Sequence, residues 1–337
     1  MSADSGSEVC VIIAAKDAAD TIGKAIASAL AETAVSEVVV IDDGSSDGTD
    51  AAARSADDGT GRLKVLRFDE NQGPSAARNR AIEASTAPLI SILDADDFFF
   101  PQRFTAMQAE KDWDLIADNI GFIHHDPSLP VEPDRLHART RSLSLVDFVE
   151  GNISQRGVKR GEIGFLKPVI RRSFLIEQGL RYNEDLRLGE DYDLYLRALA
   201  KGARYKVIDH CGYAAVVRAN SLSGRHRTQD LRRLYEAEQA IRLTPGLLSA
   251  EQAQAVRRHE RQIKARHDLR KALDVKAEGG KGAAIRHLLA NPSAAPAVIG
   301  GVLGDKLEAM RNKGTVPQPV PEGKLRYLLP GVPVAQR

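Results

Sequence analysis

The 337-residue sequence is poor in cysteine and has no long apolar run. Its two cysteines, Cys10 and Cys211, do not form a CxxC pair, so a disulfide framework is excluded. No segment approaches the roughly 18 consecutive apolar residues of a membrane-spanning helix. The beginning of the chain lacks a basic region followed by an apolar stretch, so we expect no signal peptide and a cytoplasmic protein.

The sequence also lacks an excess of charge of one sign. It has 47 Lys and Arg against 46 Asp and Glu, a net charge of +1, which argues against nucleic acid as a partner. The charge is unevenly distributed, with −9 over residues 1–224, +7 over residues 225–287 and +3 over residues 288–337. A shift of this size predicts a boundary near Arg225.

Short apolar runs and helical patterns alternate in the first third of the chain. The predicted strands are Glu8–Ala14, Glu37–Ile41, Leu63–Phe68 and Pro88–Leu93, and the predicted helices between them include Thr21–Thr33 and Pro74–Ala84. This alternation predicts an α/β fold with a mostly parallel sheet and helices on both faces. The strands are apolar throughout rather than alternating, which is typical of strands buried on both faces.

The pattern becomes mixed beyond Leu115. Strands are predicted at Pro168–Ile170 and Tyr205–Ile208, with a helix over Asp191–Ala200 between them. After Arg225 the pattern is mostly helical, and the tail of the chain is rich in proline. We therefore predict two parts, an α/β domain over residues 1–225 and a basic helical extension over residues 226–337 that ends in the proline-rich tail.

Carboxylates follow two of the predicted strands directly. Asp42 and Asp43 come after the second strand, and Asp94, Asp96 and Asp97 come after the fourth. Each group alone is compatible with a polar turn or a helix cap. Three carboxylates within four residues, however, repel one another unless a cation offsets them. Because Mg²⁺ typically uses one or two carboxylates plus substrate phosphates, a site for a metal and a diphosphate explains the cluster better.

At this point the sequence resembles glycosyltransferase family 2, with the GT-A fold. The matching segments read, in chain order, VCVIIAAKDAADTI, EVVVIDDGSSDGT, NQGPSAARNRAIE, LISILDADDFFFP and GEDYDLYLRALAKG. They span roughly residues 8–225, and they are similar to bacterial exopolysaccharide enzymes of the succinoglycan type. The resemblance implies a Rossmann-like mixed sheet, with a donor-binding half over about residues 1–100 and an acceptor half over about residues 101–225.

The resemblance implies roles for the acidic clusters. Asp42 and Asp43 would contact the uracil and ribose of a nucleotide-sugar donor. Asp94 and Asp96 would form the DxD element, in which Asp96 binds Mn²⁺ or Mg²⁺ and Asp94 contacts the ribose or the sugar. Arg78 would lie against the diphosphate or brace the DxD aspartates. A cation and an arginine suit a leaving group on which negative charge grows.

The segment that begins the predicted helix 191–200 carries a candidate catalytic base. Acids are favoured at helix N-termini by the helix dipole alone, so Glu190 and Asp191 have a purely structural explanation. By resemblance, Asp191 is the carboxylate that takes the proton of the acceptor hydroxyl in one inverting displacement. Glu190 would bind the acceptor or orient the base. Arg218 and Arg225 would belong to a lid over the diphosphate, or to an ordinary surface loop.

One position departs from the family pattern. The first strand of the family usually ends in Pro-x-Tyr-Asn or a similar sequence, whereas this chain has Ala14-Ala15-Lys16-Asp17. The aromatic side chain that would lie against the base is absent, and Lys16 stands in its place. Recognition of the base is therefore expected to differ in detail.

The predicted helices after Arg225 are rich in arginine, most densely over residues 257–266. Solvated helix surfaces explain such a run first. Peripheral contact with an anionic membrane surface explains it almost as well and would suit an enzyme with a lipid-linked acceptor. Nucleic-acid binding ranks far behind, because few aromatic residues accompany the charges.

The resulting hypothesis is an inverting, metal-dependent glycosyltransferase. It would move a sugar, with glucose preferred, from a UDP-sugar to a growing exopolysaccharide repeat unit on a lipid carrier, at the inner face of the cytoplasmic membrane. One alternative is a non-catalytic protein that binds nucleotide sugars on the same fold. A sugar-phosphate nucleotidyltransferase is a weaker alternative, since no glycine-rich phosphate loop follows the first strand.

Overall fold

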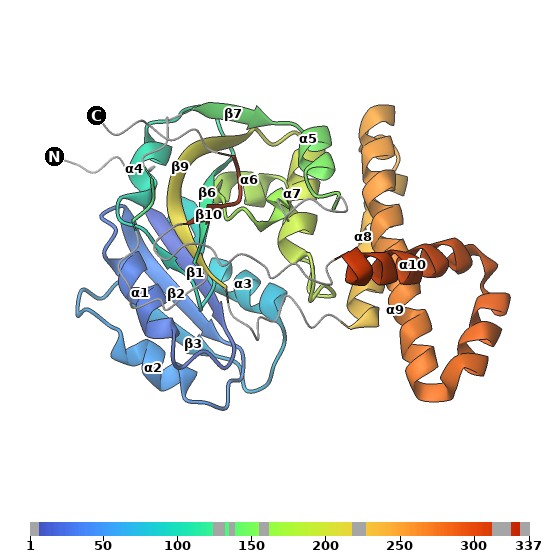
Figure 1. Cartoon of the computed structure of the whole chain (residues 1–337). Coiled ribbons are helices and arrows are strands. Elements are labelled where there is room, and N and C mark those ends of the chain that lie inside the picture. The colour runs from blue at the N-terminus through green and yellow to red at the C-terminus, as the bar shows by residue number, and fades with distance from the viewer. Residues whose placement is uncertain are drawn as a thin grey trace. The chain divides into compact units, whose positions relative to one another are not determined.

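The computed structural model describes residues 7–123, 132–134, 139–154, 162–217, 227–311 and 325–330. The chain divides into two compact units. The sheet unit comprises Met1–Ala219 and Val320–Arg337, and the helical unit comprises Asn220–Pro319. Figure 1 shows the sheet surrounded by helices in the first unit and a purely helical second unit.

Ten strands form one mixed sheet among the described residues, in the order β3-β2-β1-β4-β8-β6-β9-β5, with β10 beside β6 and β7 beside β9. Their bounds are β1 Val9–Ala15, β2 Val35–Asp42, β3 Leu63–Arg67, β4 Leu89–Ile92, β5 Phe98–Phe99, β6 Leu115–Ile123, β7 Thr140–Leu143, β8 Val169–Arg171, β9 Tyr205–Val216 and β10 Arg326–Tyr327. The α-helices of this unit are α1 Ile22–Leu30, α2 Thr49–Ser55, α3 Pro74–Glu83, α4 Arg103–Gln108, α5 Leu145–Glu150, α6 Arg172–Glu177 and α7 Glu190–Ala200.

The first four strands pair in parallel, as the apolar runs predict. β1 lies between β2 and β4, and β3 pairs with the outer edge of β2. The chain thus moves outward from β1 to β3 and returns to β4 on the other side of β1. Because crossovers between parallel strands are right-handed, α1 and α2 cover one face of the sheet and α3 covers the other. The point between β1 and β4 is a topological switch point, where α/β proteins bind their ligands.

The second half of the sheet is mixed. β8 pairs antiparallel with both β4 and β6, whereas β6 and β9 are parallel. β6 was not predicted, because its apolar residues are interrupted by Asp118 and Asn119, yet both of these side chains are fully buried. The predicted α/β fold with a mixed sheet flanked by helices is confirmed.

A buried ion pair explains the acid in the middle of β6. Arg103 and Asp118 are both 0% exposed, and Nη2 of the arginine lies 2.9 Å from Oδ1 of the aspartate. The same guanidinium donates hydrogen bonds to Ser91 Oγ and to the carbonyl of Lys167, and the Gly212 amide donates to Asp118. A Cβ at Gly212 would lie 2.4 Å from Cγ of Arg103, so this position requires glycine. The pair thereby joins β4, β6, β9 and Lys167, which lies two residues before β8.

The end of the chain returns to the sheet unit. β10 pairs antiparallel with β6, the Leu328 amide donates to the Ile120 carbonyl, and Asn119 exchanges hydrogen bonds with the backbone of Leu329. The predicted single extension over residues 226–337 therefore differs from the structure, in which the described residues 325–330 belong to the sheet. Two buried leucines and a backbone ladder explain why this stretch leaves the helical unit.

The helical unit consists of α8 Thr228–Leu243, α9 Ala250–Ala290, a 3₁₀ turn at Pro292–Ala294 and α10 Ala295–Arg311. Ser249 caps α9 with the side chain and backbone of Gln252 in a reciprocal capping box, and Gly280 breaks the helix with φ 72°. Two side-chain contacts join α8 to α9: Glu238 lies 2.6 Å from Nδ1 of His259, and the partly buried Arg242 pairs with Glu260 at 2.6 Å. Among the described residues, no helix is long and apolar enough to cross a membrane.

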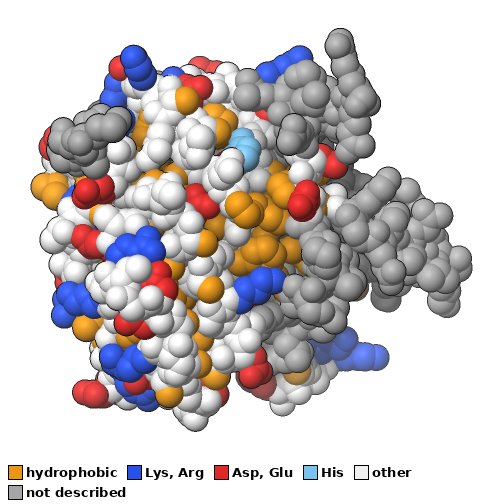
Figure 2. Space-filling view, turned by 90° about the vertical axis from the view of Figure 1, so that its left-hand side faces the viewer, with side chains coloured by type: hydrophobic (Ala, Val, Ile, Leu, Met, Phe, Trp, Pro, Cys, Tyr) orange, Lys and Arg blue, Asp and Glu red, His pale blue; other side chains and the backbone are white. Residues whose placement is uncertain are grey.

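The surface of the molecule carries charges of both signs. Figure 2 shows one face on which Lys, Arg, Asp and Glu side chains are interspersed, with apolar side chains gathered between them. The acidic excess of the first 224 residues is therefore not concentrated on this face.

Replacing Arg103 with Met should destabilise the fold strongly, because it leaves the buried carboxylate of Asp118 without its cation. Breaking a buried pair in this way costs about 3–5 kcal/mol. Urea unfolding of Arg103→Met measures the loss. The control is Arg54→Met, which removes an exposed i,i+4 pair with Asp50 and should change the free energy of unfolding by less than about 0.5 kcal/mol. Equal effects of the two substitutions would contradict the role of the buried pair.

Candidate functional site

The predicted site residues lie at the carboxyl ends of the parallel strands. Asp42 is the last residue of β2, and Asp94 follows β4 after one residue. Since β2 and β4 flank β1, their ends meet at the switch point. The two acidic clusters that follow these strands in the sequence therefore lie at the same edge of the sheet.

Asp42 is fully buried and braces the turn after β2. Its carboxylate accepts a hydrogen bond from the Ser45 amide and pairs with Arg67 at the end of β3. Arg67 also donates to the Ser45 carbonyl at 2.7 Å. The carboxylate that was predicted to contact the donor thus has partners within the protein.

Asp43 joins the turn after β2 to the loop that precedes α3. Its carboxylate accepts hydrogen bonds from the Asn71 side chain at 2.8 Å and from the amides of Gln72 and Gly73 at 2.6 and 2.9 Å. Between the two aspartates and this loop, Gly44 has φ +67°, and a Cβ there would lie 2.8 Å from the Glu70 carbonyl carbon. The DDG sequence therefore fixes where α3 begins.

Lys16, which directly follows β1, contacts the turn after β2. Its ammonium group lies 2.5 Å from the Gly44 carbonyl and 3.6 Å from Asp17. The residue that replaces the family's aromatic side chain thus binds backbone at the switch point.

Four side chains from four elements form a closed ring of charges. Arg78 of α3 lies 3.0 Å from Asp94 Oδ1 and 3.4 Å from Asp191 Oδ1. Lys167, just before β8, lies 2.9 Å from Asp94 Oδ2 and 2.7 Å from Asp191 Oδ2. Each carboxylate is thus held between the same two cations. The structure brings together the predicted residues Arg78, Asp94 and Asp191, and it adds Lys167.

Arg78, Lys167 and Asp191 are buried, the Asp94 side chain is 33% exposed, and the four charges stabilise one another. Burial alone would raise the pKa of Asp94, but Lys167 and then Arg78 outweigh it and lower the pKa to about 2. Burial disfavours the charged forms of Lys167 and Arg78, but Asp191 is the strongest of the carboxylates that hold the pKa of both above their usual values. Asp94, Lys167 and Arg78 are therefore charged at neutral pH.

Glu190 and Asp191 begin α7, as the sequence predicts. Glu190 lies 2.7 Å from Arg78, so the arginine contacts three carboxylates. Oδ2 of Asp191 accepts the hydrogen bond from Lys167, whereas Oδ1 is buried and receives no hydrogen bond from the residues that the structure describes. Such a half-satisfied carboxylate is unusual in a folded protein and marks a place where a ligand group would bind.

The remaining aspartates of the DxD segment differ from one another. Asp97 is buried and accepts hydrogen bonds from the Tyr213 hydroxyl and the Val216 amide of β9. Burial, with the charges of Asp94 and Asp96, raises the pKa of Asp97 well above its usual value. Asp97 is therefore an anchor of the turn, whereas Asp96 is partly exposed.

The described residues contain no group of three His, Cys, Asp or Glu side chains that would hold a metal by themselves. Asp94 faces two cations, and Asp97 faces β9. The partly exposed Asp96 remains suited to the arrangement in which one carboxylate and substrate phosphates share the ion. The predicted lid residues Arg218 and Arg225 lie outside the described residues.

Lys167 is the main residue that the sequence reading missed. It lies in the segment Phe165-Leu166-Lys167-Pro168-Val169, where a single charge stands among apolar residues before a buried strand. A lysine in such a position has to be paired when the strand is buried. That signal predicts a carboxylate partner without naming it.

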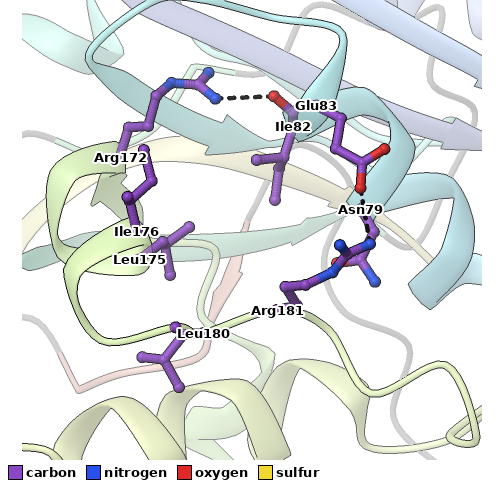
Figure 3. A pocket seen from close by; sticks show the side chains of 9 residues that line it. Asn79, Ile82, Glu83, Arg172, Leu175, Ile176, Leu180 and Arg181 are labelled. Atoms are coloured by element: carbon purple, nitrogen blue, oxygen red, sulfur yellow. Dashed lines mark hydrogen bonds and ion pairs between the residues drawn. The ribbon is translucent and has the colours of Figure 1, made fainter.

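A shallow hollow of about 230 Å³ lies behind α3, against α6. Figure 3 shows Arg172 and Ile82 on one side and Glu83 with Arg181 on the other. The Arg172 guanidinium donates to the Ile82 carbonyl, and Glu83 pairs with Arg181 at 2.8 Å. Its charged groups thus have partners of their own, since Arg172 donates to backbone and hydroxyl oxygens and Glu83 pairs with Arg181.

Comparison with known proteins identifies the class. The model of the family described as "Glycosyl transferase family 2" matches residues 10–175. A curated protein of Rhizobium meliloti (strain 1021), "Succinoglycan biosynthesis protein ExoU", is 58% identical over 341 residues, which cover 100% of this chain and 99% of that protein. The chain therefore belongs to glycosyltransferase family 2, and it is a glycosyltransferase.

Solved structures show the same fold at low sequence identity. The S. aureus TarS 1-349 complex with UDP-GlcNAc has a TM-score of 0.58 and 16% identity, with 94% of this chain and 95% of that chain covered. The mannosyltransferase PcManGT from Pyrobaculum calidifontis, in complex with GDP-Man and Mn2+, has a TM-score of 0.50 and 19% identity, with 89% of this chain and 80% of that chain covered. The expected GT-A fold is confirmed.

Replacing Asp97 with Asn should remove a pH-dependent loss of stability. The raised pKa means that folded Asp97 holds a proton that the unfolded chain releases above its usual value of 3.8, so the free energy of unfolding falls as the pH rises through that window. The stability of Asp97→Asn relative to wild type should therefore increase with pH, by at most about 1.4 kcal/mol per unit. Urea unfolding in EDTA, from about pH 4 upward, measures the difference, and a constant difference would show that folded Asp97 is ionised.

Proposed function

We propose that the enzyme transfers a sugar, with glucose as the first candidate, from a UDP-sugar to a growing, lipid-linked exopolysaccharide repeat unit and inverts the anomeric centre. The observation that carries the proposal is Asp191, a carboxylate at the N-terminus of α7 whose Oδ1 is buried and receives no hydrogen bond from the described residues. The name of the R. meliloti relative supports the polysaccharide, and the UDP-GlcNAc complex of TarS supports the type of donor.

In the proposed reaction the acceptor hydroxyl attacks C1 of the donor sugar from the face opposite the diphosphate. A bond forms between the hydroxyl oxygen and C1, the bond from C1 to the diphosphate breaks, and UDP leaves. Asp191 takes the hydroxyl proton through Oδ1 as the new bond forms. Arg78 holds this carboxylate and Asp94 together, so base and donor site stay in a fixed relation. Glu190, paired with Arg78, would bind the acceptor.

The donor side is proposed to follow the acidic strand ends. Asp94 would accept hydrogen bonds from the ribose or the sugar, and Asp42 and Asp43 would shape the nucleoside site at the end of β2. Arg78 would attract the diphosphate, because it is the arginine of the ring and contacts Asp94 of the DxD turn. Arg218 and Arg225 are proposed to close over the diphosphate.

Mn²⁺ or Mg²⁺ is proposed as the cofactor. Asp96 would hold it together with diphosphate oxygens, and the ion would neutralise charge on the departing UDP. The Mn2+ complex of PcManGT supports a divalent ion. The pairing of Asp94 with two cations supports a single protein carboxylate as ligand.

The donor and the base are tested with a panel of UDP-sugars, the purified chain, and Mn²⁺, Mg²⁺ or EDTA. We expect slow release of UDP from one sugar with metal and none with EDTA. Asp96→Ala should abolish the metal-dependent reaction. Asp191→Asn should reduce transfer to membrane extracts that contain lipid-linked saccharide by about 10²–10⁴-fold, the usual contribution of a general base.

The matched control is Asp50→Asn, which alters a carboxylate on the outer surface of α2 and should leave the rates unchanged. Full activity of Asp191→Asn on the extract would contradict its role as base. If wild type neither binds UDP nor releases it from any UDP-sugar with any metal, the UDP donor is wrong, and GDP-sugars would be tested next.

Peripheral membrane contact is proposed for the helical unit, at the inner face of the cytoplasmic membrane. The unit carries 18 Lys and Arg against 10 Asp and Glu. The predicted basic run 257–266 is partly packed, because His259, Glu260 and Ile263 are buried. Of the ten large apolar side chains that are exposed among the described residues, six lie between residues 273 and 310: Leu273, Ile285, Leu289, Ile299, Leu303 and Met310.

Three of these side chains form a stripe on α10. Ile299, Leu303 and Met310 are separated by four and seven residues, which places them on one face of the helix. An apolar stripe on a unit with a positive net charge is typical of helices that lie in the interface of an anionic bilayer. We therefore propose the contact at α10 rather than at the arginine run.

Replacing Ile299 and Leu303 with Ser should weaken binding to vesicles that contain phosphatidylglycerol. Burial of each apolar side chain is worth about 1.5–3 kcal/mol, so the double variant should bind at least about tenfold more weakly in a flotation assay. Ile176→Ser, at a still more exposed position of the sheet unit, is the control. Unchanged flotation would contradict the membrane contact, and loss of a dimer on sedimentation would assign the stripe to a second copy of the chain.

A further inference from the structure

Lys167 occupies a position that couples the two halves of the site. Its ammonium group contacts one carboxylate on the donor side, Asp94, and one on the acceptor side, Asp191, at 2.9 and 2.7 Å. Its own backbone carbonyl accepts a hydrogen bond from the buried Arg103 at 2.6 Å. The lysine is therefore fixed at both ends, by the core ion pair at its backbone and by the ring of charges at its side chain.

The two oxygens of Asp191 have different surroundings. Oδ2 accepts the hydrogen bond from Lys167 at 2.7 Å, and Oδ1 faces Arg78 at 3.4 Å without a hydrogen bond. The hydroxyls of Tyr182 and Tyr205 are buried and make no hydrogen bond of normal geometry in the described part of the chain, and burial followed by the charge of Asp191 raises the pKa of both. Lys167 thus holds this carboxylate by a hydrogen bond at 2.7 Å, whereas Arg78 lies 3.4 Å from its other oxygen.

We infer that Lys167 is a positioning residue, which holds Oδ2 of Asp191 so that Oδ1 is the oxygen that takes the acceptor proton. The inference rests on the proposed function of Asp191 as the base. Lys167 itself contacts neither the reacting hydroxyl nor C1 in this assignment. Because the same ammonium group holds Asp94, a shift of the donor-side carboxylate is transmitted to the base through one side chain.

Removing the ammonium group should reduce turnover much more than donor affinity. A displacement of a reacting group by about 1 Å can cost about 100-fold in rate. We therefore expect Lys167→Met to lower kcat for release of UDP from the accepted UDP-sugar by about 100-fold, while its affinity for UDP, measured by calorimetry with Mn²⁺, changes by less than about threefold. The matched control is Lys206→Met, which removes a lysine of β9 that pairs with Glu110. This variant should retain the wild-type kcat.

A second variant separates positioning from charge balance. Asp94→Asn combined with Lys167→Met restores the net charge of the ring and so remains testable where the single substitution fails to fold. If Lys167 positions Asp191, the double variant should stay about 100-fold below Asp94→Asn alone. Equal kcat values for these two variants would overturn the inference, since Lys167 would then serve only to neutralise Asp94.

Failure of the inference is distinguishable from failure of the proposed function. Wild-type kcat in Lys167→Met, with an active wild-type enzyme, overturns the role of Lys167 and leaves the base assignment intact. Absence of UDP release by the wild-type enzyme itself removes the proposed donor, and the role of Lys167 is withdrawn with it.

Discussion

The burial of opposite charges in one ring is the constraint on which the site depends. Removing a single charge from water is expensive, and a pair recovers that cost only when its geometry is tight and its remaining polar atoms are satisfied. Arg78 and Lys167 approach this condition together, because each contacts both Asp94 and Asp191, although Oδ1 of Asp191 still lacks a hydrogen bond from the described residues. The stability of each charge therefore depends on four parts of the fold at once: the helix α3, the end of β4, the segment before β8 and the helix α7.

A second buried pair lies next to the first and supports it. Arg103 and Asp118 cross the middle of the sheet, and Arg103 holds the carbonyl of Lys167. The antiparallel strands beyond β4 are thus joined to the parallel half by charge as well as by the backbone ladder. This explains how a sheet of mixed direction can keep Lys167 within hydrogen-bond distance of a carboxylate on each side.

Local patterns predicted the parallel half of the fold and most of the site. Continuous apolar runs gave β1 to β4, and the acids at the strand ends gave the edge where the site lies, because both signals are local in the chain. β6 was missed, since its buried acid is stable only through Arg103, a partner 15 residues away. Lys167 was missed for the same reason: its two partners are 73 and 24 residues distant in the chain, and periodicity carries no information about such pairs.

The aspartates of the acidic motifs also differ in role, and several of them have structural partners rather than the ligand contacts that the motifs alone imply. Asp42 and Asp43 have the backbone and side chains of two loops as partners, and Asp97, whose pKa is raised by burial, is bound to β9. These three aspartates fix the positions of α3 and of the DxD turn. Aspartates at these positions of a sequence therefore indicate, first of all, stable turns at the switch point of the sheet, and only secondarily contacts with a ligand. Two carboxylates remain as candidates for a direct part in the reaction. Asp96 is partly exposed beside this anchored turn, and Oδ1 of Asp191 is buried without a hydrogen bond from the described residues.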